Sequence, residues 1–141
     1  MLQVRNSSLL CLLTMVATLI GCGRNEGPKT AVVSGKVTLN GAPLESGQIS
    51  FVPSDGVGTP SGAKIAGGAY RADVPLGAKR VEIRAPKIVG QKDAYEGDPN
   101  SPKIDLIEEL IPPRYNAQSE LKATVATGSN VQDFSLEAPK P

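Results

Sequence analysis

Short segments in which apolar and polar residues alternate, separated by turns rich in glycine and proline, constrain the fold of this chain most strongly. The clearest spans residues 79–85, where Val81, Ile83 and Ala85 alternate with charged residues. Fifteen glycines and twelve prolines among 141 residues favour a protein with many turns. Similar segments occur at residues 31–39, 48–53, 63–66, 70–74, 121–125 and 134–136. About seven short strands without a helical period predict an all-β fold, a β-sandwich with its apolar residues between two sheets.

The first 21 residues have a different pattern, which predicts a signal peptide. Arg5 is followed by an uncharged, largely apolar run over residues 7–20. This run is shorter than the roughly 20 residues that a membrane-spanning helix needs. It ends in Leu19-Ile20-Gly21-Cys22, which resembles the lipobox of bacterial lipoproteins. The resemblance implies cleavage between Gly21 and Cys22, with lipid attached to the Cys22 sulfur and then to the new amine.

This cleavage would leave a tethered protein of 120 residues, which is enough for one domain. We expect a lipidated cysteine and flexible spacer over residues 22–30, one sandwich domain over 31–138 and a tail over 139–141. The expected partner is a membrane, bound through two or three acyl chains on Cys22. Gly23 is not the Asp that favours inner-membrane retention in proteobacterial lipoproteins, so an envelope location at the outer membrane is favoured.

Composition argues against several functions. Removal of Arg5 balances 14 basic against 14 acidic residues, so no nucleic-acid partner is expected. The chain has no histidine, and Cys11 would leave with the signal peptide while Cys22 is consumed by lipid. Histidine-based catalysis, a thiol nucleophile and an ordinary zinc site are therefore excluded for the mature domain. We expect no enzymatic activity, no cofactor and no metal.

Three stretches between the predicted strands have less regular patterns. Residues 88–103 contain four glycines or prolines and several charges, which predicts a long exposed loop. Residues 106–111 fit either a short strand or one helical turn before Pro112-Pro113. The segments at 121–125 and 134–136, separated by a turn at Gly128-Ser129-Asn130, predict a closing hairpin.

A series of short motifs runs along the predicted domain: Val33-Ser-Gly-Lys-Val-Thr-Leu-Asn-Gly41, Pro43-Leu44, Gly47-Gln48-Ile49, Phe51-Val52-Pro53, Gly68-Ala69-Tyr70, Val74-Pro75-Leu76-Gly77, Ile111-Pro112, Arg114-Tyr115-Asn116 and Ser119-Glu120-Leu121. Together they resemble the motifs of transthyretin-like, carboxypeptidase-regulatory-like domains, and more narrowly those of small planctomycete lipoproteins of that type. The resemblance covers about residues 32–137 and implies a prealbumin-like, immunoglobulin-like sandwich. It implies little about activity. The histidines of the related hydroxyisourate hydrolase have no counterpart here.

Two groups of residues are candidates for ligand contact. Arg114, Tyr115 and Asn116 follow two prolines; we expect Tyr115 to pack its ring on the sandwich and hydrogen-bond the backbone, with ligand contact as the alternative. The same structural role is expected of Tyr70. An acidic cluster in and just after the predicted loop could bind calcium, but its spacing fits a solvated surface better. The cluster consists of Asp93, Glu96, Asp98 and Asp105.

The sequence therefore predicts a lipid-anchored envelope protein whose sandwich has a binding or structural role, with an envelope protein or a glycan as its partner. The alternative is an accessory module that binds a glycan or Ca²⁺ at the cell surface.

Overall fold

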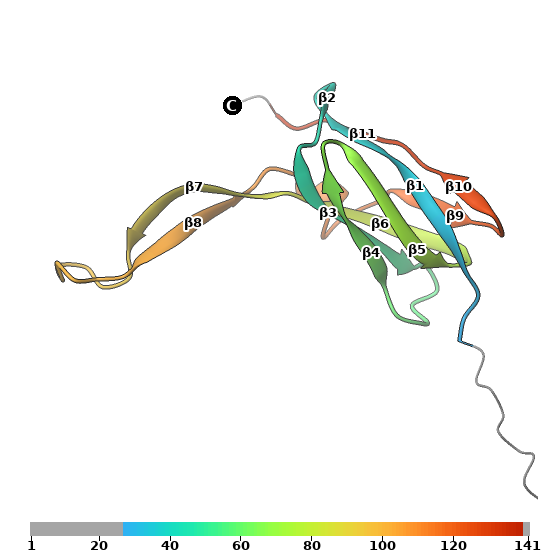
Figure 1. Cartoon of the computed structure of the whole chain (residues 1–141), viewed down its shortest axis with the longest axis horizontal. Coiled ribbons are helices and arrows are strands. Elements are labelled where there is room, and N and C mark those ends of the chain that lie inside the picture. Colours follow the sequence, from blue (N-terminus) through green and yellow to red (C-terminus); the bar gives the residue numbers. More distant parts are fainter. Residues whose placement is uncertain (1–26, 140–141) are drawn as a thin grey trace, which may run out of the picture.

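The computed structural model describes residues 27–139, so the predicted signal peptide, the cleavage site at Gly21 and the lipidation site at Cys22 lie outside the described residues. Within this range the chain is nearly all β (Figure 1). The strands are β1 (Thr30–Leu39), β2 (Ala42–Pro43), β3 (Ser46–Pro53), β4 (Ser61–Ala66), β5 (Ala69–Pro75), β6 (Gly77–Arg84), β7 (Pro86–Asp93), β8 (Lys103–Glu109), β9 (Lys122–Val125), β10 (Ser129–Val131) and β11 (Phe134–Leu136). One short 3-10 helix, η1, spans Pro113–Tyr115.

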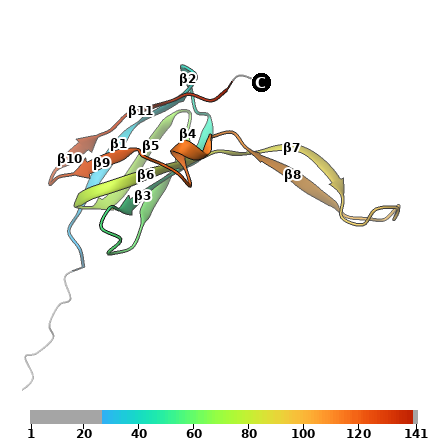
Figure 2. The ribbon, with the colours of Figure 1, turned by 180° about the vertical axis from the view of Figure 1, so that it is seen from behind.

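Nine of these strands form the body of the molecule. Their order is β10-β1-β5-β4-β3-β6-β9, and β2 and β11 also pair with β1. Strands β4 and β5 pair only through Ala66 and Ala69 at a tight turn, so the sheet divides there into two halves. The halves curl around a common core, which gives the predicted all-β sandwich (Figure 2).

The core consists of the inward residues of the alternating segments. Val81 and Ile83 of β6 are fully buried, as are Val33 and Val37 of β1, which confirms the predicted period of two. Three aromatic rings connect the two halves of the sandwich. The Tyr70 ring centroid lies 6.1 Å from that of Phe51 and 6.4 Å from that of Phe134. These separations are typical of favourable aromatic packing.

The prediction of a closing hairpin is wrong. Strand β9 pairs antiparallel with β6, whereas β10 and β11 pair with β1 in parallel. The two parallel pairings keep one register, from Val32 opposite Ser129 to Leu39 opposite Leu136. Strands β10 and β11 thus pair with β1 in a single register, and this pairing is interrupted at Gln132 and Asp133. The turn at residues 126–128 carries the chain from one half of the sandwich to the other, so β9 is an edge strand beside β6 and β10 is an edge strand beside β1.

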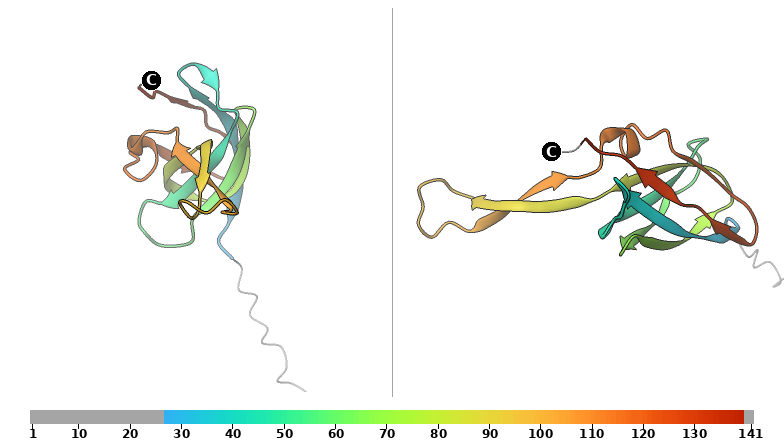
Figure 3. Two further views of the ribbon diagram at one scale, coloured as in Figure 1. Left: turned by 90° about the vertical axis from the view of Figure 1, so that its left-hand side faces the viewer. Right: turned by 90° about the horizontal axis from the view of Figure 1, so that it is seen from above.

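The prediction of an exposed loop over residues 88–103 is also wrong. Strands β7 and β8 pair antiparallel and form a two-stranded ribbon, here called the arm (residues 86–109), which projects from one end of the sandwich (Figures 1 and 3). A bulge between Ile88 and Gly90 shifts the register by one residue. Of the two structures that residues 106–111 fitted, β8 shows the strand through Glu109. Only the tip at residues 94–102 remains a loop.

Candidate functional site: an apolar arm and the grooves at its base

The arm concentrates the exposed apolar side chains of the molecule. Nine large apolar side chains are exposed within residues 27–139, and seven of them lie on the arm or at its base. These seven are Ile88, Val89, Tyr95, Ile104, Leu106, Ile107 and Leu110. Every residue of β8 is exposed, because neither face of the ribbon packs on the sandwich. Clustered apolar exposure of this kind is typical of a contact surface.

The base of the arm is fixed firmly to the sandwich. The Glu109 carboxylate oxygen Oε1 accepts hydrogen bonds from the backbone N–H groups of Ala85 (2.7 Å) and Ile111 (3.1 Å). Ala85 and Ile111 are both buried in the core, and the Leu110 N–H donates to the Ala85 carbonyl. Hydrogen bonds to a charged acceptor are stronger than neutral ones. Glu109 therefore joins the two places where the chain leaves and re-enters the sandwich.

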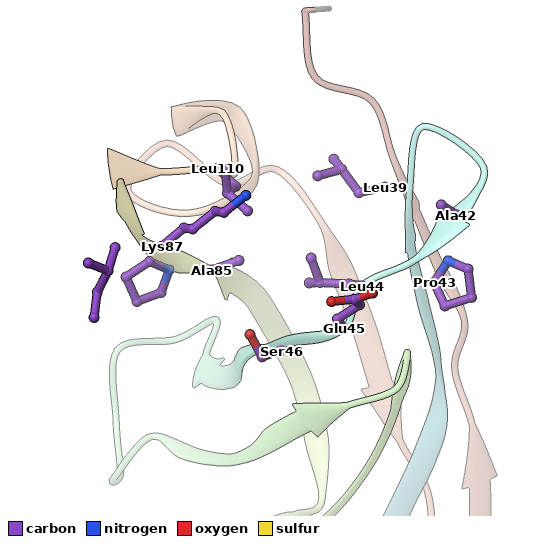
Figure 4. Close-up of a pocket in the computed structure, with 11 residues that line it drawn as sticks. Leu39, Ala42, Pro43, Leu44, Glu45, Ser46, Ala85, Lys87 and Leu110 are labelled. Atoms are coloured by element: carbon purple, nitrogen blue, oxygen red, sulfur yellow. The ribbon is translucent and has the colours of Figure 1, made fainter. Parts of the chain in front are cut away.

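Two shallow grooves flank this base. The first, of about 550 Å³, lies between the β2–β3 segment and the start of β7, and Figure 4 shows the side chains around it. Its lining includes Leu39, Leu44, Ala85, Ile88 and Leu110, with Glu45 and Lys87 as its charged groups. The second, of about 630 Å³, lies beside the end of β8 and contains Leu110, Ile111, Pro112 and Pro113. The first groove presents mainly apolar side chains, whereas the second is also lined by Arg84, Glu108, Glu109 and Asn116.

The candidate ligand residues Arg114, Tyr115 and Asn116 are brought together at η1, where they hold the C-terminal segment. The Tyr115 ring packs against the core, and its hydroxyl accepts the Glu137 N–H at 3.2 Å, which confirms its predicted structural role. The guanidinium carbon of Arg114 lies 4.8 Å from the centroid of that ring, and its Nη2 donates a 2.6 Å hydrogen bond to the Glu137 carbonyl oxygen. Asn116 is buried and donates to the Ile111 carbonyl at 2.9 Å. Their polar groups are thus largely used within the fold.

Tyr70 has the structural role that the sequence predicted. Its hydroxyl donates a 2.7 Å hydrogen bond to the Gln132 carbonyl, and the side chain is buried. Burial, and to a smaller extent the negative charge of Asp133, raises the pKa of Tyr70 above its ordinary value of 10.0. The phenol therefore stays protonated under physiological conditions and acts as a donor to the backbone.

Three of the four acidic calcium candidates have partners on the arm itself, and the fourth, Glu96, is exposed at its tip. Asp93 forms a 2.7 Å ion pair with Lys103, Asp105 accepts from the Gln91 side chain, and Asp98 accepts the Asn100 N–H. Between residues 27 and 139, no group of three or more His, Cys, Asp or Glu side chains is placed to hold a metal ion. The described part of the chain also contains no helix long and apolar enough to cross a membrane.

Comparison with protein-family models, curated proteins and solved structures gives no match to this chain. The relation to transthyretin-like lipoproteins accordingly stays a prediction from the motifs.

Sequence reasoning missed the arm as a candidate site. The sequence feature that could have indicated it is the pair of apolar groups Ile88-Val89 and Ile104, Leu106 and Ile107. Both groups lie within stretches whose other residues are typical of a loop or of the end of a strand. Gly97, Asp98 and Pro99 between them are turn residues of the kind that join two strands.

Proposed function

We propose that this chain is a lipid-anchored protein of the cell envelope, at the outer membrane, whose transthyretin-like sandwich has a binding or structural role. The anchor would be diacylglycerol and fatty acid on Cys22, as the Leu19-Ile20-Gly21-Cys22 motif predicts. Two or three acyl chains would hold the protein stably at the membrane.

The single observation that carries the binding role is the position of the apolar arm relative to the N-terminal strand. Thr30 of β1 pairs with Pro75, and the Lys29 carbonyl accepts the Leu76 N–H, so the chain enters the sandwich at the end where β6 begins. Strand β6 then runs the length of the body, and the arm leaves after Ala85 at the opposite end (Figure 3). A tether at the N-terminus therefore leaves the apolar arm free to meet a partner.

The buried polar groups of the body are used within the fold apart from Ser61 Oγ, the one buried side-chain polar atom of residues 27–139 without a hydrogen-bond partner. Within the described residues, three polar or charged side chains are buried: Lys79, Asn116 and Ser119. The Lys79 ammonium donates to the Leu76 carbonyl at 3.3 Å, and the Ser119 hydroxyl donates to the Val81 carbonyl. Each of these groups bonds a backbone carbonyl and none forms a nucleophile with an adjacent base.

Metabolic labelling with a clickable fatty acid tests the anchor. The wild-type protein and a Cys11→Ala variant are expected to take up label, because Cys11 lies within the predicted signal peptide. A Cys22→Ala variant is expected to take up none and to accumulate with its signal peptide uncut. Equal labelling of the Cys22→Ala protein would disprove the anchor.

Site-specific photo-crosslinking in cells tests the arm as the binding surface. A benzophenone amino acid at Ile107, which is 66% exposed on β8, is compared with the same group at Val57, which is 74% exposed on the body. We expect adducts of higher mass from position 107 and none from position 57. Equal yields, or no adduct from position 107, would count against a binding role of the arm.

A further inference from the structure

The outer edge of β8 is the most open backbone surface of the arm. Each strand of a two-stranded ribbon has one edge without a neighbour, and such an edge is a template for another strand. Strand β7 begins with Pro86 and contains the bulge between Ile88 and Gly90, and both features disturb the regular spacing of its hydrogen-bonding groups. Strand β8 has seven residues without proline, glycine or a bulge.

We propose that β8 pairs with β8 of a second copy of this chain. The two strands would run antiparallel about a two-fold axis at Leu106 and form a four-stranded sheet in the order β7-β8-β8-β7. In this pairing, the partner of the arm is a second copy of the same chain. The inference rests on the proposed function in one respect, which is that anchoring at a membrane raises the local concentration of copies.

Charge complementarity selects this register. An axis at Leu106 overlaps all seven residues of β8 and places Lys103 opposite Glu109 of the second copy, twice in the dimer. Moving the axis to Asp105 would place Asp105 opposite itself. Moving it to Ile107 would place Asp105 opposite Glu109. Like charges directly opposite each other destabilise an antiparallel pair, so the register centred on Leu106 is the favoured one.

The charged groups at the ends of β8 have partners within their own chain. The Lys103 ammonium lies 2.7 Å from Asp93, its cross-strand partner on β7, so this ion pair lies across the ribbon. Glu109 uses Oε1 for both of its backbone hydrogen bonds, and its second oxygen, Oε2, takes part in neither. Lys103 of one copy can therefore bridge Asp93 of its own chain and Glu109 of the other.

The apolar side chains of the arm gather at the centre of the four-stranded sheet. Leu106 would lie opposite Leu106 of the second copy, with Ile104 of each copy on the same face, since residues two apart in a strand share a face. On the other face, Asp105 of each copy would lie opposite Ile107 of the other, with Ile88 beside Ile107. The face with Leu106 at the axis therefore has the apolar centre, and on it Ile104 lies opposite Glu108 of the second copy.

The antiparallel arrangement also fixes how the two bodies lie. The tip of each arm, at residues 94–102, comes beside the base of the other arm, where the groove along the end of β8 contains Leu110 and Pro112. The two N-terminal strands lie at the outer ends of the dimer, away from the paired arms.

Disulfide trapping in cells tests the pairing. A cysteine at the two-fold axis faces its own copy at a Cβ separation of about 5 Å, which is close enough for a disulfide after mild oxidation. Leu106→Cys in the full chain is therefore expected to give a reducible dimer as its main product. Ile88→Cys on β7 is the matched control, because β8 strands of both copies lie between its two sulfur atoms. A monomeric Leu106→Cys protein, or equal dimer from Ile88→Cys, would overturn the proposal.

A charge at the axis provides a second test on the detergent-solubilised full-length protein. Leu106→Asp places two carboxylates opposite each other and is expected to weaken dimerisation at least tenfold in sedimentation velocity. Val57→Asp introduces the same charge on the body and is expected to leave the dimer intact. Fatty-acid labelling of the same samples separates the two proposals: a labelled protein that sediments as a monomer before any substitution keeps the anchor and overturns the pairing.

Discussion

Replacement of Gly35 by alanine is expected to destabilise the sandwich strongly, although the exchange adds only one methyl group. Gly35 lies on β1 where the pairing line of β10 and β11 is interrupted, and the backbone of Gln132 passes directly over it. A Cβ at position 35 would lie 1.8 Å from the Gln132 carbonyl oxygen and 2.6 Å from its carbonyl carbon. Both atoms are backbone, and ordinary van der Waals contact begins at 3.4 Å, so about 1.6 Å of main-chain movement is needed to restore it.

Three hydrogen bonds depend on the position of this backbone. The Gln132 N–H donates to the Ser34 carbonyl at 2.9 Å, and the Gln132 carbonyl accepts the Tyr70 hydroxyl at 2.7 Å. The Lys36 N–H donates to Asp133 Oδ1 at 2.7 Å. With a net value of about 1 kcal/mol each, loss of two or three of them lowers the free energy of unfolding by about 2 to 3 kcal/mol.

Urea denaturation of the purified protein, followed by circular dichroism, measures this loss. Gly90→Ala is the control, because Gly90 is also a strand glycine without a positive φ and its Cβ would meet only a Leu106 methyl group at 3.7 Å. Alanine in a strand is intrinsically more favourable than glycine by about 0.5 to 1 kcal/mol, so the control is expected to be neutral or slightly stabilised. A Gly35→Ala protein as stable as the control would refute the steric reasoning.

Two further predictions concern hydrogen bonds between side chains and the buried backbone. Burial, and then the charge of Asp133, raise the pKa of Tyr70 above 10.0, so the stability that the protonated phenol contributes is complete below pH 10 and is lost as the pH rises further. The free energy of unfolding, measured from pH 8 to 11.5, should therefore fall more steeply for the wild type than for Tyr70→Phe. Parallel curves for the two proteins would contradict this prediction. Glu109→Ala removes the carboxylate oxygen that accepts from both the Ala85 and the Ile111 N–H groups. Hydrogen exchange should therefore accelerate at both amides, and the free energy of unfolding should fall by about 1 to 3 kcal/mol. Unchanged exchange at both amides would show that Glu109 does not fix the arm.

The strands of the body could be predicted from the sequence because the direction of a side chain in a strand depends only on its position along that strand. The alternation around Val81 and Ile83 is visible in seven residues, and both are fully buried as expected. The turn residues Asn40 and Gly41 both have positive φ, which asparagine tolerates and glycine adopts without steric cost. The end of β1 could therefore also be predicted from the sequence.

The partners of those strands could not be predicted from the same pattern. Phe134 and Leu136 face the core whether β11 pairs with β9 or with β1, so alternation does not distinguish a closing hairpin from the observed parallel pairing. The need for Gly35 has the same origin, since it follows from the passage of Gln132, which is 97 residues further along the chain.

The arm was hidden in the sequence because its apolar residues cover no core. Ile104 and Leu106 alternate with the charged residues Lys103 and Asp105 as in a half-buried strand, and only the tertiary structure shows that both strands of the ribbon are solvent-exposed. The sequence by itself determined most strand-forming segments of the body and their inward faces, because these depend on local chemistry, and it predicts attachment through Cys22. The tertiary structure decided which edges are paired, where glycine is required and that the β8 edge stays open, because these depend on contacts between distant parts of the chain.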